Sequence, residues 1–91
     1  MVIPDAEPHQ IGARLRWYRN HLGVGVVDFA KKCGVSQSQI SDWENGERNI
    51  TVRGAMKIYN AFEIDLSFIF LGAIGNLPHS IAQAWLAHNQ G

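Results

Sequence analysis

Apolar residues recur every three or four positions over most of the chain, which is the spacing of amphipathic helices. No segment alternates between apolar and polar residues for long enough to predict a β-strand. A first helix is predicted near the N-terminus and ends at Gly23. The apolar face of this helix carries Ile11, Leu15, Tyr18 and Leu22. The pattern therefore predicts a helical fold.

Two short helices are predicted next, separated by the sequence GVS. Gly34 stands where a left-handed residue commonly ends a helix, and Ser36 stands where an N-cap begins the following one. The third helix is predicted to run from Gln37 to about Asn45. The second helix is predicted over VDFAKKC, with Val27, Ala30 and Cys33 on its apolar side.

Capping residues also mark the helices in the second half of the chain. Thr51 is an N-cap candidate for a fourth helix, and Asp65 is one for a short fifth helix, LSFIFL, that stops at Gly72. A linker, AIGNLP, follows, and Pro78 can occupy the first turn of a last helix, His79 to about His88. The apolar face predicted for the fourth helix consists of Val52, Ala55, Ile58, Tyr59 and Phe62.

The second and third predicted helices form the helix-turn-helix pattern. The two helices must cross closely, and Ala30 is small enough to allow it, while Val35 and Ile40 fill the core beneath the turn. Short polar groups at the N-terminal end of a helix fit the major groove of DNA. A solvated helix face in a structural protein has the same composition, so spacing alone leaves both interpretations open. The outward residues are Gln37, Ser38, Ser41 and Asp42.

Three stretches, IGARLRWYRNHLG, FAKKCGVSQSQISDWENGER and IYNAFEIDLSFIFLG, carry a family resemblance. From Ile11 to Gly72 the chain resembles the Cro/C1-type (XRE-like) helix-turn-helix family, the fold of lambdoid phage repressors. The resemblance implies an all-α, five-helix lambda-repressor-like domain whose third helix reads bases. The last predicted helix would be an addition at the C-terminus. Residues 1–10 would form a flexible N-terminal arm, residues 11–72 the DNA-binding domain, and residues 73–91 a linker and C-terminal helix.

The same resemblance implies roles for individual residues. Gln37 and Ser38 are the leading base contacts, and Asp42 lies one turn further along. Arg19 and Glu44 match a pair that joins the first helix to the end of the third, a structural role. Contacts to DNA phosphates are implied for Asn45, Arg48, Asn49, Thr51 and Arg53.

One departure concerns the start of the second helix. Family members usually place a Thr or Ser cap there, followed by a Gln that contacts a phosphate. This chain has Gly25 and Val26 instead, and neither side chain can do so. We therefore expect weaker non-specific affinity for DNA, and the scaffold could also serve a relative that has lost DNA binding.

The charge of the chain is unevenly distributed, although its formal net charge is zero. All eight Lys and Arg residues fall between Arg14 and Lys57, a window that holds four acids, for a net charge of 8 − 4 = +4. A patch of this size is sufficient for contacts to phosphates but does not require them.

The apolar residues of the last two helices exceed what a small core can cover. The tail is expected either to fold back over its own domain or to pack against a second copy, and we expect a symmetric homodimer. Half-sites one DNA turn apart, ~34 Å, favour two-fold protein symmetry. The residues concerned are Phe68, Phe70, Ile81 and Trp85.

We interpret the chain as a sequence-specific regulator of transcription of phage-like type, a repressor with a double-stranded DNA operator as its partner. The alternatives are an antitoxin that also binds a toxin, and a protein-interaction module. No catalytic motif, metal site or cofactor site is recognisable, so we expect no enzyme activity, metal or cofactor. The first ten residues are polar and lack the basic-then-apolar pattern of a signal peptide, so we expect none. No apolar run is long enough to span a membrane, and the single cysteine fits a reducing compartment. We therefore expect the cytoplasm, with association to the nucleoid when bound.

Overall fold

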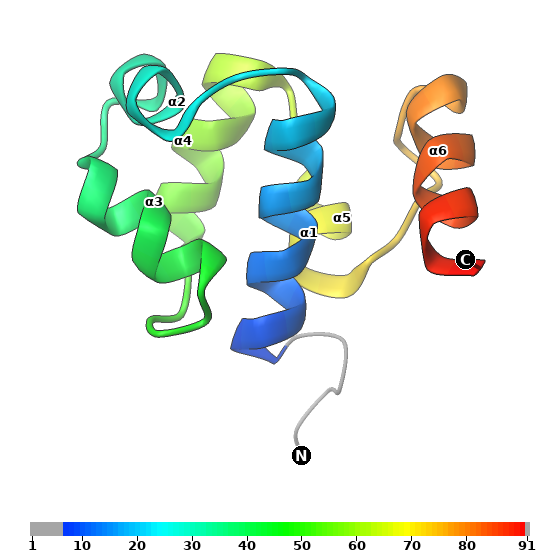
Figure 1. Ribbon diagram of the computed structural model, residues 1–91, viewed down its shortest axis with the longest axis horizontal. Helices are drawn as coiled ribbons and strands as arrows, with labels where there is room; N and C mark the ends of the chain where they lie inside the picture. The colour runs from blue at the N-terminus through cyan, green and yellow to red at the C-terminus, as the bar shows by residue number, and fades with distance from the viewer. Residues whose placement is uncertain (1–6, 91) are drawn as a thin grey trace.

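The computed structural model describes residues 7–90, which form six α-helices and no strand (Figure 1). The predicted fold class, a five-helix domain with an added C-terminal helix, is confirmed. Within the described residues, no helix is both long and apolar enough to cross a membrane. The helices are α1 (Pro8–His21), α2 (Val26–Cys33), α3 (Gln37–Glu44), α4 (Val52–Phe62), α5 (Leu66–Leu71) and α6 (His79–Gln90).

α1 begins at Pro8, inside the segment expected to be an arm of residues 1–10. Proline is favoured at the start of a helix because its fixed φ is helical and its missing N–H has no partner there in any case. The carbonyl of Glu7 accepts the first hydrogen bond, from the Ile11 amide. Residues 8–10 are therefore the first turn of α1, and residues 1–6 of the expected arm lie outside the described residues.

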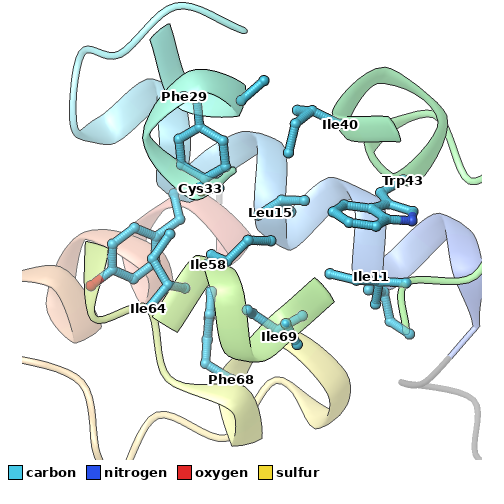
Figure 2. Packing of buried hydrophobic residues seen from close by; sticks show 14 of the residues in the cluster. Ile11, Leu15, Phe29, Cys33, Ile40, Trp43, Ile58, Ile64, Phe68 and Ile69 are labelled. Carbon is cyan, nitrogen blue, oxygen red and sulfur yellow. The ribbon is translucent and has the colours of Figure 1, made fainter. Parts of the chain in front are cut away.

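The core is built around α1, with residues from all six helices packed in one cluster. Figure 2 shows Leu15 of α1 between side chains of α2, α3 and α4. Phe29 stacks on Phe62 with ring centroids 4.6 Å apart, which joins α2 to α4. The largest side chains that are fully buried are Phe29, Phe68, Leu15, Ile40, Ile58, Ile64 and Ile69.

Three of the predicted apolar faces are partly wrong. Leu22, predicted on the apolar face of the first helix, lies just past the end of α1 and is 39% exposed. In α2, Val27 is 57% exposed, because the buried side is set by Phe29, Ala30 and Cys33. In α4, Val52 and Tyr59 are 62% and 46% exposed. At 100° per residue they fall beside the arc that Ala55, Ile58 and Phe62 direct to the core.

The predicted helix caps lie where the sequence indicates. Gly34 ends α2 in the left-handed conformation, with φ of 74°. The Ser36 side chain accepts from the Gln39 amide while the Gln39 side chain accepts from the Ser36 amide, which is a reciprocal capping box. The side chains of Thr51 and Asp65 cap α4 and α5.

Of the two arrangements left open for the tail, the structure has the one in which it folds back over its own domain. Leu77 and Ala82 join the buried core. The ring of Trp85 packs edge-on against Trp17 of α1 and Phe68 of α5, with ring centroids 5.1 and 5.2 Å apart. Of the four predicted tail-packing residues, Phe68 is fully buried and Phe70, Ile81 and Trp85 are half-buried.

Cys33 is buried in α2, and burial raises the pKa of its thiol to about 11. We expect iodoacetamide to alkylate it roughly 100-fold more slowly in the native protein than in urea, since thiolate is the reacting form. In the unfolded chain the Cys33 thiol loses its proton near its ordinary pKa, whereas in the folded protein it keeps the proton up to about pH 11. The free energy of unfolding should therefore fall as the pH rises between these two values. Mass spectrometry of timed samples measures the alkylation rates, and equal rates in the native protein and in urea would contradict the burial of Cys33.

Candidate nucleic-acid interface

α2 and α3 cross at a tight turn, and this crossing sets the direction of α3. Past Gly34, the Val35 amide donates to the Ala30 carbonyl at 3.1 Å. Ala30 is 3% exposed, as the close crossing requires. Ile40 and Trp43 anchor α3 to the core (Figure 2). The inward side of α3 is therefore fixed by packing, and its opposite side faces outward.

None of the four predicted base-reading residues of α3 is buried. Gln37 and Ser38 are exposed in the first turn, and Ser41 and Asp42 are half-buried further along. α6 lies on the opposite side of α1 from α3 (Figure 1). The tail therefore leaves the start of α3 open.

The predicted phosphate-contacting residues lie in the loop after α3 and in the first turn of α4, and all five are exposed. Asn45 is also bonded within the protein, because its side-chain oxygen accepts from Arg16 of α1. Thr51 Oγ1 accepts from the Gly54 amide at 2.9 Å, so its hydroxyl caps α4. α3 and this loop together line a hollow of about 440 Å³. Its walls are Ser38, Gln39, Asp42, Trp43, Arg48, Asn49 and Thr51.

The predicted structural pair, Arg19 and Glu44, is joined in the structure. Arg19 Nε and Nη2 donate to the two carboxylate oxygens of Glu44 at 2.6 and 2.9 Å, and Arg19 Nη1 donates to the Val24 carbonyl at 2.8 Å. Both side chains are buried. The hydrogen bonds to Glu44 raise the Arg19 pKa, against the opposing effect of burial. The end of α3 is therefore tied to α1 by two charge-assisted hydrogen bonds.

A helix-turn-helix family model matches residues 15–69, which is more than half of the chain. The chain belongs to the Cro/C1-type (XRE-like) helix-turn-helix family. Members of this family are DNA-binding transcription regulators and are generally not enzymes. Comparison with curated proteins finds no match. The matched residues begin within α1 and end within α5, so α6 is an addition to the family domain.

Gly12 is a residue of this XRE-like domain that sequence reasoning missed. A Cβ there would lie 2.4 Å from the Trp43 carbonyl oxygen and 2.5 Å from that of Glu44. The backbone of α1 therefore meets the end of α3 with no room for a side chain. The available signal was an isolated glycine inside a helical pattern, which is often a site of close packing.

The basic surface of the XRE-like domain is smaller than the sequence suggests. Arg14 is buried and donates to the Ile69 and Phe70 carbonyls at the end of α5, each at 3.0 Å. Arg19 is also buried and bound to Glu44, whereas Arg16 donates to Glu44 and Asn45 but stays exposed. The remaining 8 − 2 = 6 basic residues are all exposed: Arg16, Lys31, Lys32, Arg48, Arg53 and Lys57.

The departure at α2 has a structural counterpart. Gly25 is the N-cap residue of α2 in extended conformation, and no side chain caps the helix. Val26 is half-buried against the core. The family's cap and phosphate-binding glutamine are therefore replaced by a glycine and a packing residue.

Proposed function

We propose that this XRE-like protein is a sequence-specific regulator that binds double-stranded DNA through α3. The observation that carries the proposal is the open, polar first turn of α3, with Gln37 and Ser38 exposed beside a loop that carries exposed Arg48. A helix of this kind fits the major groove, where each base pair presents a distinct pattern of donors and acceptors. Gln37 can bond both edge groups of an adenine, and Ser38 tolerates several base edges.

The loop and the start of α4 would hold the DNA backbone. Arg53 and Asn49 are exposed there, and the first backbone amides of a helix bind phosphates well. Two such proteins related by two-fold symmetry would place α3 in successive major grooves, ~34 Å apart. Repression would follow when the bound dimer excludes polymerase from a promoter.

Selection of bound duplexes from a random pool tests the proposal, at a stated salt concentration. We expect an enriched palindromic site, and Gln37→Ala should cost ~1–3 kcal/mol on it and relax one base position in each half-site. Arg53→Ala is the matched control, because removal of a phosphate contact should weaken all sequences alike and flatten the salt dependence. Unchanged binding of both variants to the selected site would contradict this contact map.

A second candidate, a protein-interaction module, is favoured by two observations. α2 lacks a side-chain cap and the family's glutamine, and α4 exposes an apolar stripe of Val52, Met56 and Tyr59. Contiguous exposed apolar surface often marks an interface with another protein. Failure of the wild-type protein to enrich any duplex would favour this candidate over the regulator.

A further inference from the structure

An ion pair lies beside the predicted base-reading residues of α3. Arg48 Nε is 3.3 Å from Asp42 Oδ2, and the two side chains are 77% and 31% exposed. The backbone holds the partners near each other, because the amides of Glu47 and Arg48 both donate to the Asp42 carbonyl, at 2.9 and 3.3 Å. Asp42 and Arg48 therefore face each other on the wall of the same hollow, one from α3 and one from the loop.

The two partners suit different parts of DNA. Asp42 follows Ser38 by four residues, so it lies one helical turn further along the same side of α3. A carboxylate accepts hydrogen bonds only, and in the major groove it can accept from the cytosine amino group. A bare carboxylate near phosphates is repelled, whereas an arginine there is attracted. A pair this exposed is weak, so little opposes a change of partners.

We infer that Asp42 and Arg48 exchange partners when DNA binds, an inference that rests on the proposed function. In the free protein Arg48 neutralises Asp42. In the complex Arg48 turns to a backbone phosphate, and Asp42 accepts a hydrogen bond from a cytosine amino group. Asp42 is then the residue that selects a C·G pair next to the position read by Ser38. Arg48 contributes affinity without sequence preference.

The test compares sites selected by the wild type with those selected by Asp42→Asn, Arg48→Ala and Glu47→Gln. Asparagine has the shape of aspartate but carries donors, so Asp42→Asn should lose about 10-fold preference for cytosine at one base pair per half-site. Glu47→Gln is the matched control, since it removes an exposed acid from the same loop. It should raise affinity for all duplexes and leave the selected sequence unchanged. Arg48→Ala should keep the preference for cytosine, but it should weaken binding to all duplexes. It should also reduce the slope of log affinity against log salt concentration by about 1.

Each other outcome overturns a defined part of the inference. An unchanged preference in Asp42→Asn, repeated with Asp42→Ala, would show that Asp42 does not read this base pair. Loss of the same preference in Arg48→Ala would show that the pair reads DNA as one joined unit without exchange. A wild-type protein that enriches no sequence would overturn the proposed function itself. Thermal unfolding of each variant verifies that the domain is folded.

Discussion

Glu44→Ala is expected to lower the free energy of unfolding by about 3–5 kcal/mol, since it leaves the buried Arg19 guanidinium without its carboxylate. The side chains of Arg19 and Glu44 are only 10% and 3% exposed, so water has little access to the lost partner's position. A small domain has a total stability of roughly 5–15 kcal/mol, so this variant should be close to unfolding at 37 °C. Urea titration followed by circular dichroism measures the loss.

Arg16→Ala provides the control on the same carboxylate. Arg16 Nε is 3.4 Å from Glu44 Oε1, but its side chain is 48% exposed, so its removal should cost at most about 1 kcal/mol. The paired replacement Arg19→Met with Glu44→Leu should recover most of the stability, because no buried charge remains. Equal losses for Glu44→Ala and Arg16→Ala would contradict a buried origin of the effect.

Gly12→Ala should destabilise the protein by about 2 kcal/mol, although alanine is the better helix former. The added methyl group would meet the backbone carbonyls of Trp43 and Glu44, which cannot move without separating α1 from α3. Overpacking of this kind costs about 3 kcal/mol, and the gain in helix propensity returns roughly 1 kcal/mol. For a domain of this length the midpoint of thermal unfolding should fall by roughly 10 °C.

Gly75→Ala is the matched control for this replacement. Gly75 lies in the linker before α6, has no positive φ, and has no atom within 4 Å of the position of a Cβ. Its replacement should change the midpoint little or raise it slightly, because alanine restricts the unfolded chain. A Gly12→Ala protein as stable as wild type would mean that α1 and α3 are further apart than described.

Local chemistry made much of the fold predictable. Ser36, Thr51 and Asp65 each cap the helix that the sequence indicated, because a cap depends on neighbours within three residues. The exposed positions of Val27, Val52 and Tyr59 were not predictable, since a short helix can direct either of two adjacent arcs to the core. Only tertiary packing decides between them.

The candidate site, like the fold, has some features that local sequence predicts and others that only tertiary packing decides. The outward position of Ser38 follows from helical spacing and the family pattern. Gln37 shares a face with buried Ile40 and Glu44 and is exposed because it is the first residue of α3. Arg14 donates to two carbonyls at the end of α5 that lie 55 and 56 residues further along the chain, so no local pattern predicts these hydrogen bonds. The pairing of Asp42 with Arg48 depends on how the loop folds back over α3, which its sequence does not specify.

Burial of Arg14 and Arg19 within the protein has a kinetic consequence for a DNA-binding role. Fewer neutralised phosphates release fewer condensed counterions, and counterion release drives most attachment to random sequence. A protein with this charge arrangement would stay only briefly at each incorrect site and would search by dissociation and rebinding more than by sliding. Its residence time at an operator would then depend on the hydrogen bonds that α3 makes to base edges.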